Sequence, residues 1–368
     1  MSADIAGRAP AHIRGIAPYV AGKPIDELAR ELGLDPASIV KLASNENPRG
    51  PSPAVAAAMR AAMAEVTRYP DSNGFALKAA IAARFGVAPE SIVLGNGSND
   101  ILELVTHAFL QPGDEAVYSQ YGFVVYPLAT QARGARGIAV PARDFGHDLD
   151  AMAAAVTPAT RIVFVANPNN PTGTWIAPER IRRFIEAMPR DVVVVLDEAY
   201  NEYLAPRDDA QSAQWLSDLP NLVVSRTFSK AYGLAGLRVG YGVMRPGVAD
   251  LLNRVRPPFN VNALAQAAAI AALADGAYVD ASRRLNDEGM RALAAGFDAL
   301  GLRYLPSHGN FVLVDVGDGT RVFERLLRAG VIVRPVANYG LPAWIRVTVG
   351  LPHENARLLA AMPTALAR

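Results

Sequence analysis

Short apolar runs recur through the middle of this 368-residue chain, and each ends at a polar or glycine-rich turn. The run Val192–Leu196 reads VVVVL, without the apolar–polar alternation of a half-exposed strand. Such runs are typical of strands buried on both faces, as in mostly parallel sheets. Because helix patterns separate the runs, the chain is predicted to contain an α/β domain with its sheet between helices. The further strands are expected at Ser91–Gly95, Glu115–Ser119, Gly137–Val140, Arg161–Ala166, Leu222–Ser225 and Val239–Val243, and the helices at Val124–Gln131, Leu149–Ala155 and Pro178–Met188.

The last third of the chain has a different pattern. Two long alanine-rich helices are expected at Val261–Leu273 and Val279–Leu300, followed by mixed strands and helices, including one strand over Val331–Arg334. We place a domain boundary near Pro257–Asn262, where the pattern changes. The predicted organisation is an N-terminal arm at 1–44 that packs with the small domain, a large domain at 45–258 and a smaller α+β domain at 259–368.

Composition excludes several classes of protein. The apolar fraction of 51% is enough for a large buried core. Lysine and arginine (36) nearly balance aspartate and glutamate (35), so we expect no basic surface for nucleic acid or membrane. The absence of cysteine removes thiol catalysis and cysteine-bound metals, and we predict no metal site. The N-terminal residues lack the apolar core of a signal peptide, so a cytoplasmic protein is expected.

Lys230 lies in the stretch SRTFSKAYGLAGLRVGYG (225–242), between a predicted strand and a glycine-rich run. Its neighbours are small or aromatic, and Arg238 follows eight positions later. A lysine amine that is shielded from water, or placed beside another cation, is partly neutral near neutral pH and can attack an aldehyde. Pyridoxal phosphate is the usual aldehyde cofactor held in this way. The alternative is an ordinary loop lysine beside a glycine turn.

Polar motifs follow other predicted strands. GNGSND (95–100) joins a strand to a helix, a layout that directs backbone N–H groups at an anion. NPNNPTG (167–173) and DEAY (197–200) each follow directly after a buried strand. Ligands of open α/β sheets bind outside the carboxyl ends of the strands. We therefore expect one crevice to bring together Ser98, Asn170, Asp197, Tyr200 and Lys230.

Taken singly, each of these residues has a simpler interpretation. Asp197 at a strand end can cap a turn or helix, and Asn170 can form a turn. Tyr121 and Tyr69 can belong to the packed core, and Arg346 can form a surface ion pair of little energetic value. These alternatives become harder to sustain when the motifs are read together and in order.

The ordered set SNENP, GNGSN, NPNNPTG, DEAY, SKAYGLAGLRVGYG and IRVTVG resembles that of the fold type I aminotransferases, and most closely that of the histidinol-phosphate aminotransferases. The resemblance runs from about Tyr19 to the C-terminus. NPTG alone is moderately specific, whereas the whole set in this order is highly specific. The resemblance implies a large domain with a mostly parallel mixed sheet between helices, a smaller α+β domain, and pyridoxal 5'-phosphate as cofactor.

The resemblance also assigns roles at the matching positions. Lys230 corresponds to the lysine that joins the cofactor covalently and later moves a proton at the substrate. Asp197 corresponds to the carboxylate that keeps the pyridine nitrogen protonated, so that the ring can accept electrons. Tyr200 and Asn170 correspond to the pair at the phenolic oxygen, and Tyr200 joins Lys230 and Asp197 as an expected catalytic residue. The ring is expected to stack on an aromatic residue and the phosphate to lie in a polar cradle, formed by Tyr121 and by Ser98, Asn99, Ser229 and Arg238, respectively.

A homodimer is implied as well, because the tyrosine that matches Tyr69 reaches the phosphate site of the neighbouring subunit in this family. Substrate binding is assigned to Arg346, whose guanidinium suits a carboxylate or a phosphate. Arg334, Tyr19 and Asn47 are expected to line the same pocket.

The implied reaction is the transamination of L-histidinol phosphate with 2-oxoglutarate, giving imidazole-acetol phosphate and glutamate in histidine biosynthesis. The partners are then a small amino donor, a 2-oxo acid and a second copy of the chain. Two alternatives stay open: an aromatic-amino-acid aminotransferase, which has much the same motifs, and a decarboxylase or lyase on the same scaffold. A DNA-binding regulator is disfavoured, because residues 1–44 are too short and too poorly patterned for such a module.

Overall fold

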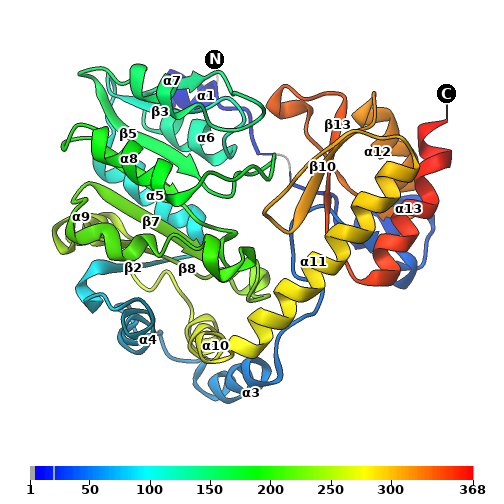
Figure 1. Cartoon of the computed structure of the whole chain (residues 1–368). Helices are drawn as coiled ribbons and strands as arrows, with labels where there is room; N and C mark the ends of the chain where they lie inside the picture. Colours follow the sequence, from blue (N-terminus) through cyan, green and yellow to red (C-terminus); the bar gives the residue numbers. More distant parts are fainter. Residues whose placement is uncertain (1–4, 20, 368) are drawn as a thin grey trace.

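The computed structural model describes residues 5–19 and 21–367. These residues form a larger lobe around a twisted sheet and a smaller lobe that carries the C-terminus (Figure 1). The long helix α11 (Gly276–Ala299), yellow in Figure 1, runs from the base of the larger lobe into the smaller one. Within the described residues, no helix is both long and apolar enough to cross a membrane.

The sheet of the larger lobe contains seven strands in the described part of the chain, in the order β2-β8-β7-β6-β5-β3-β4. Strand β8 is antiparallel to β2 and β7, and the other neighbours are parallel. This confirms the predicted α/β fold with a mostly parallel mixed sheet. The strands are β2 (Ile92–Gly95), β3 (Glu115–Ser119), β4 (Arg136–Val140), β5 (Thr160–Ala166), β6 (Val193–Asp197), β7 (Leu222–Thr227) and β8 (Gly240–Met244).

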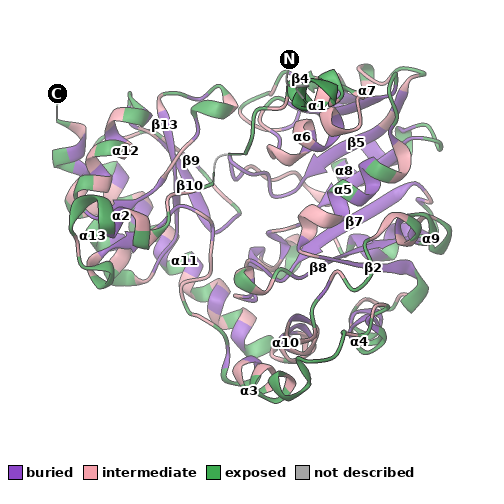
Figure 2. Cartoon of the chain, turned by 180° about the vertical axis from the view of Figure 1, so that it is seen from behind, coloured by how far each residue is buried: buried purple, intermediate pink, exposed green. Residues whose placement is uncertain are grey.

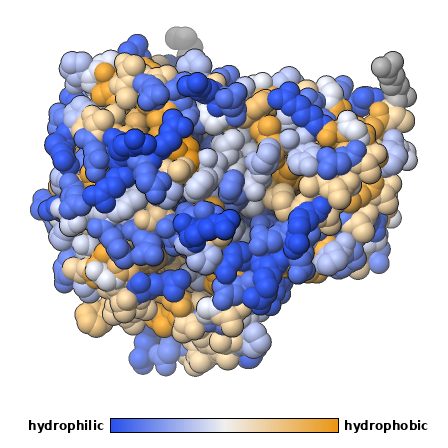
Figure 3. All heavy atoms as spheres, viewed as in Figure 1, coloured by the Kyte–Doolittle hydropathy of each residue, from blue (hydrophilic) through white to orange (hydrophobic). Residues whose placement is uncertain are grey.

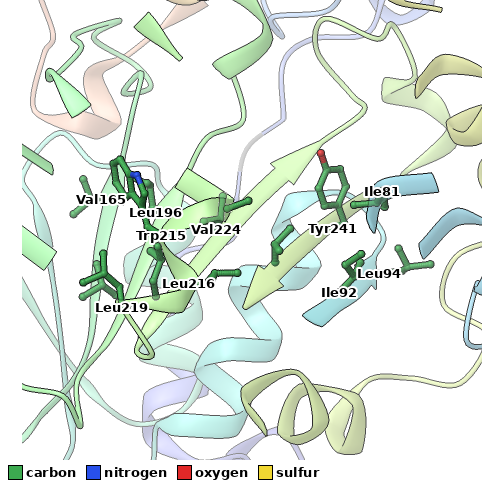
Figure 4. Packing of buried hydrophobic residues seen from close by; sticks show 14 of the residues in the cluster. Ile81, Ile92, Leu94, Val165, Leu196, Trp215, Leu216, Leu219, Val224 and Tyr241 are labelled. Carbon is green, nitrogen blue, oxygen red and sulfur yellow. The ribbon is translucent and has the colours of Figure 1, made fainter. Parts of the chain in front are cut away.

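Both faces of this sheet are buried, which explains the continuous apolar runs. In β5, Val163 and Val165 pack with one set of helices, whereas Ile162 and Phe164 pack with the other. Figure 2 shows the strands as almost wholly buried except the edge strand β4, most of whose residues are exposed, and Figure 4 shows side chains of the first cluster packed together. The helices of the first set are α3 (Pro53–Ala62), α4 (Phe75–Phe85), α7 (Leu149–Ala154), α8 (Pro178–Ala187) and α10 (Ala263–Ala274), and those of the second are α5 (Ser98–Phe109), α6 (Val125–Ala132) and α9 (Pro246–Val255).

In the described residues, the smaller lobe has a four-stranded antiparallel sheet in the order β12-β13-β10-β9. Alternate residues of β13, such as Ile345 and Val347, pack against helices on one face. Successive side chains of a strand point to opposite faces, so Arg346 and Thr348 face away from those helices. The elements are β9 (Tyr304–Leu305), β10 (Phe311–Asp315), β12 (Arg334–Pro335), β13 (Trp344–Thr348), α12 (Gly319–Arg328) and α13 (Pro352–Leu366).

The N-terminal part of the chain completes the smaller lobe. Strand β1 (Val40–Lys41) pairs in parallel with β11 (Val331–Ile332), and Leu28 of α2 (Ile25–Leu32) packs against Ile332. The single strand predicted over residues 331–334 is divided, because β11 pairs with β1 whereas β12 pairs with β13. The short helix α1 (Ala11–Arg14) lies instead against α6 of the larger lobe.

Candidate active site

A polar cavity of about 210 Å³ lies where β5, β6 and β7 end, facing the smaller lobe. Its position follows from the parallel sheet, since the carboxyl ends of parallel strands meet at one edge. The wall includes most of the residues that the sequence singled out: Tyr19, Ser98, Asn99, Asn170, Asp197, Tyr200, Ser229, Lys230, Arg238, Arg334 and Arg346. Residues from both lobes and from widely separated motifs therefore surround one space.

Lys230 follows β7 through a tight turn, in which the Ser229 amide donates to Thr227 Oγ1 at 3.1 Å. Its Nζ donates to the Ser44 carbonyl at 3.1 Å. Burial lowers the pKa of Lys230 to about 7, and the charges of Arg346 and Arg238 act in the same direction. An amine in this setting is substantially neutral at neutral pH and can act as a nucleophile or base at Nζ.

Asp197 is the last residue of β6 and is 5% exposed. Its carboxylate accepts hydrogen bonds from Tyr126 Oη at 2.9 Å and from the Ala199 amide at 3.2 Å. Burial nevertheless raises the pKa of Asp197 to about 6, so these bonds only partly compensate for lost hydration. A cationic group in the cavity beside this carboxylate would compensate for the rest.

The next residue along, Glu198, takes part in a separate buried network. It forms an ion pair with Arg226 at 2.7 Å, and Arg226 also reaches Glu202 at 3.3 Å. Both Glu198 and Arg226 are almost fully buried. The DEAY motif thus serves two purposes, because Asp197 lines the cavity while its neighbour anchors the segment behind it.

The end of the cavity near α5 is built for an anion. Gly97 precedes α5 with a φ of 84°, which glycine adopts without strain. A Cβ on Gly240 would lie 2.6 Å from the Ser98 amide nitrogen, so two glycines let the strand and the helix start approach closely. Arg238 Nη1 reaches Ser229 Oγ at 3.3 Å. A helix start, two hydroxyls and a guanidinium suit a phosphate group.

Arg346 enters the cavity from β13 of the smaller lobe and is 7% exposed. Its Nη1 donates to Asn170 Oδ1 at 2.6 Å and its Nη2 to the Ala43 carbonyl at 2.8 Å. Its Nε is buried without a hydrogen-bond partner among the described residues. Arg334 lies directly opposite Arg346 in the β12–β13 pair, with its guanidinium 5.5 Å from the ring centre of Tyr19. Two cations side by side are expected to attract an anion.

Three expected site residues lie outside this cavity. Tyr121 stacks on Phe145 at 5.9 Å, and Phe123, two residues later, lines the cavity instead. Asn47 donates to the Ala231 carbonyl at 2.8 Å, so it supports the lysine loop from behind. Tyr69 is 83% exposed on the surface of the larger lobe.

Several residues that line the cavity, and one that supports it from behind, were not predicted from the sequence. Asn45 lines the cavity and lies in the SNENP motif, two residues before the expected Asn47. Tyr126, the hydroxyl donor to Asp197, occupies a helix position that reads as ordinary core. Phe123 and Tyr339 also line the wall or lie close behind it, and nothing in their local pattern distinguishes them from packed aromatics.

These residues fit pyridoxal phosphate. The buried Asp197 suits a protonated ring nitrogen, the glycine-lined start of α5 suits the phosphate, and Lys230 suits the aldehyde. The Nε of Arg346, which has no hydrogen-bond partner in the described part of the chain, leaves a donor for a substrate anion.

Comparisons with known proteins agree with this geometry. Residues 37–362 match the family model of "Aminotransferase class I and II". The chain is 59% identical over 369 residues to "Histidinol-phosphate aminotransferase 2" of Pseudomonas fluorescens, covering 100% of both chains. It is 60% identical over 361 residues to "Histidinol-phosphate aminotransferase 1" of Cupriavidus pinatubonensis, covering 97% and 96%.

A solved structure shows the same fold. The histidinol-phosphate aminotransferase of Sinorhizobium meliloti, determined in complex with pyridoxal-5'-phosphate, superposes with a TM-score of 0.90 at 34% identity, over 98% of this chain and 97% of that one. The matches run through both lobes, and the matched span of 37–362 contains the positions of all the motifs around the cavity. The chain therefore belongs to the class I and II aminotransferases, pyridoxal-phosphate-dependent enzymes of fold type I.

Proposed function

We propose that this chain transfers the amino group of L-histidinol phosphate to 2-oxoglutarate in histidine biosynthesis. The observation that carries the choice of substrate is the arginine pair on the smaller lobe. Arg334 and Arg346 are direct cross-strand partners, so their side chains lie on the same face of the sheet. Two guanidiniums on one face suit a phosphate dianion, and the carboxylates of glutamate can use the same donors. The full-length similarity to histidinol-phosphate aminotransferases supports this assignment.

The residues divide the work of the reaction. Bound pyridoxal phosphate supplies an aldehyde for covalent attachment and a ring that accepts electron density from the substrate carbon. Asp197 holds the proton of the ring nitrogen in place, and Tyr126 fixes the orientation of that carboxylate. Lys230 Nζ, with its pKa lowered to about 7, removes and returns the proton at the substrate carbon.

A hydrogen bond across the boundary between the lobes joins Asn170 and Arg346. Because Asn170 Oδ1 accepts from Arg346, the amide NH₂ of Asn170 is left to donate into the cavity. The Ser98–Asn99 helix start and Arg238 retain the phosphate end. The cavity wall thus combines an acid–base residue, a fixed carboxylate and two separate anion sites.

We further propose a cytoplasmic homodimer in which Tyr69 completes the phosphate site of the partner subunit. Tyr69 stacks on Phe259 at 4.7 Å, and both rings are exposed in the single chain. Other large apolar side chains are exposed near Tyr69 in the sequence, namely Met63, Val66 and Phe75. Exposed apolar side chains that gather on a surface are candidates for burial against a second copy. Figure 3 shows that hydrophilic residues dominate the left and centre of the face drawn, whereas apolar residues are more frequent on the smaller lobe and at the lower end.

Donor profiling tests the substrate assignment. The purified enzyme would be assayed with histidinol phosphate and with phenylalanine, each with 2-oxoglutarate as acceptor. A kcat/KM for histidinol phosphate well above that for phenylalanine supports the proposal, and the reverse order identifies an aromatic-amino-acid aminotransferase. Glutamate alone should bleach the absorbance of the lysine-bound cofactor. An unchanged absorbance would exclude glutamate-linked transamination and leave the decarboxylase or lyase alternative.

A mixed-dimer experiment tests the composite site. A chain altered at Tyr69 and a chain altered at Lys230, each inactive alone, should regain partial activity when combined. Complete failure to recover activity in verified mixed dimers would contradict the shared site.

A further inference from the structure

Asn45 is a buried residue at the boundary between the lobes, and it contacts both of them. It is 1% exposed and adopts a left-handed backbone conformation with φ of 55°. Asparagine tolerates this region better than most residues, but it is still sparsely populated and is often held there for a function. Asn45 also lines the cavity that contains Lys230.

The hydrogen bonds around Asn45 fix the orientation of its side-chain amide. Its backbone N–H donates to Thr348 Oγ1 at 2.9 Å. The Thr348 hydroxyl in turn donates its proton to Asn45 Oδ1 at 3.1 Å. The amide oxygen therefore faces Thr348, and the amide NH₂ faces the other way.

The amide NH₂ of Asn45 meets the hydroxyl of Tyr200. Asn45 Nδ2 donates to Tyr200 Oη at 2.8 Å. An amide nitrogen has no free lone pair to accept a proton in return, so Tyr200 cannot donate back to Asn45. Tyr200 is almost fully buried and lines the cavity. Its proton is consequently left for an acceptor inside the cavity.

We propose that Asn45 is a positioning residue, which orients the Tyr200 hydroxyl so that its proton is donated to the oxygen acceptor of the bound cofactor. The inference rests on the proposed pyridoxal-phosphate function and deepens it. It also links the two lobes, because Thr348 lies two residues beyond Arg346 on β13. The segment that recognises the substrate anion thereby holds, through Asn45, the hydroxyl that tunes the cofactor.

The charges around Tyr200 agree with a donor role. Burial raises the pKa of Tyr200 to about 12, so the hydroxyl keeps its proton at neutral pH. Arg346 and the hydrogen bond from Asn45 oppose that rise, while Asp197 and Tyr339 add to it. Lys230 Nζ lies 5.8 Å from the ring centre. Tyr200 is thus a neutral donor among groups that all face the same cavity.

The test is a pH titration of the visible absorbance of the lysine-bound cofactor, without substrate, in Asn45→Gly and Asn45→Asp. Glycine removes the side chain but keeps the left-handed backbone free of strain. Aspartate keeps the shape but accepts the Tyr200 proton instead of donating to its oxygen. The nitrogen that joins Lys230 to the cofactor carries a proton that hydrogen-bonds to the cofactor oxygen. The Tyr200 hydroxyl competes with that proton for the lone pairs of the oxygen, so losing the hydroxyl as a donor favours the protonated nitrogen. Both variants should therefore raise the titration midpoint by about one pH unit, as Tyr200→Phe should.

A double variant distinguishes positioning from a general structural effect. If Asn45 acts through Tyr200, adding Asn45→Gly to Tyr200→Phe should produce no further shift of the midpoint. An additive shift overturns the proposal. A midpoint that stays at the wild-type value in the Asn45 variants, while Tyr200→Phe shifts it, also overturns the proposal. Circular dichroism of each variant would serve as the control for correct folding. Failure of the wild-type protein to form the absorbing adduct with pyridoxal phosphate would instead refute the proposed function.

Asn310→Ala is the matched control. Asn310 Nδ2 donates to the Asn45 carbonyl at 3.0 Å, so this change removes a contact to the same residue without touching its link to Tyr200. Thermal stability should fall while the titration midpoint stays within about 0.3 pH unit of wild type, well below the shift that loss of a hydrogen bond produces. A shift as large as that of Asn45→Gly would mean that any loosening of this loop moves the midpoint, and would contradict the specific role of the side chain.

Discussion

The two walls of the cavity are built in different ways. On the larger lobe, Asp197 and Lys230 come from the ends of β6 and β7, which are neighbours in one buried parallel sheet. Their backbone positions are fixed by strand pairing and by side chains packed on both faces. On the smaller lobe, Arg334 and Arg346 are cross-strand partners near one edge of a four-stranded sheet within the described residues.

The smaller-lobe wall is held in place by contacts across the boundary between the lobes. Arg346 donates to Asn170, and the His308 amide donates to the Gly173 carbonyl at 2.9 Å. A side chain at Gly173 would collide with Ser307, so the two lobes approach closely there. In the proposed function the two walls have different tasks. The sheet of the larger lobe fixes the groups proposed to do chemistry, and the smaller lobe supplies the groups proposed to select the substrate.

The largest effect should come from the larger-lobe wall. Lys230→Ala removes the nucleophile and the base together, so turnover should fall by at least roughly 10⁴-fold and the absorbance of the lysine-bound cofactor should disappear. Far-ultraviolet circular dichroism should be unchanged. A borohydride-reducible cofactor adduct that persists in this variant would show that another lysine does the work, and would break the assignment of chemistry to this wall.

A change on the smaller-lobe wall should affect substrate binding rather than cofactor attachment. Arg346→Gln removes a charged donor worth about 2–3 kcal/mol, so kcat/KM should fall about 100-fold for histidinol phosphate and for glutamate. The cofactor should still attach to Lys230, as seen from its absorbance. Loss of the cofactor together with activity would show that the two walls do not have separate tasks.

Arg334→Gln should sharpen the same comparison with a smaller effect. Arg334 is less buried than Arg346, and only a dianionic group needs both guanidiniums. We expect kcat/KM for histidinol phosphate to fall about tenfold while that for phenylalanine changes little. Equal losses for both donors would argue that Arg334 supports the fold of the pocket instead of reading the phosphate.

The smallest effect concerns the pH dependence of cofactor capture by the larger-lobe wall. Only the neutral amine attacks the aldehyde, and the lowered pKa of Lys230, about 7, keeps it neutral above that pH. The rate of pyridoxal phosphate capture by the cofactor-free protein should rise about fivefold from pH 6 to pH 7 and level off above pH 8. A rate that keeps rising tenfold per pH unit to pH 10 would indicate a lysine with an ordinary pKa.

The sequence predicted the larger lobe better than the smaller one, for a physical reason. Runs such as Glu115–Ser119 are buried on both faces, so their pattern alone defines strands, and the structure gives that strand the same bounds. A polar residue directly after such a run, as with Asp197, must lie at the sheet edge where ligands bind. The location of the chemical groups therefore followed from local pattern and family motifs.

What could not be predicted depends on distant partners. Residues 331–334 are predicted as one strand, yet they belong to two strands, β11 and β12, because their partners are β1 and β13. Tyr126 occupies a helix position typical of core, and its role appears only when Asp197, 71 residues later, lies 2.9 Å away. The left-handed backbone of Asn45 has no sequence signal beyond an asparagine among other polar residues.

The pairing of β1 with β11 has a consequence for how the protein is made. Val40 leaves the ribosome about 290 residues before its partner Val331, so the first strand must wait through most of translation. The large sheet, whose strands lie between residues 92 and 244, can assemble during that interval. Arg346 is synthesised last among the groups that surround the cavity. A nascent chain therefore has its large sheet, with Asp197 and Lys230 at the strand ends, before it has Arg346.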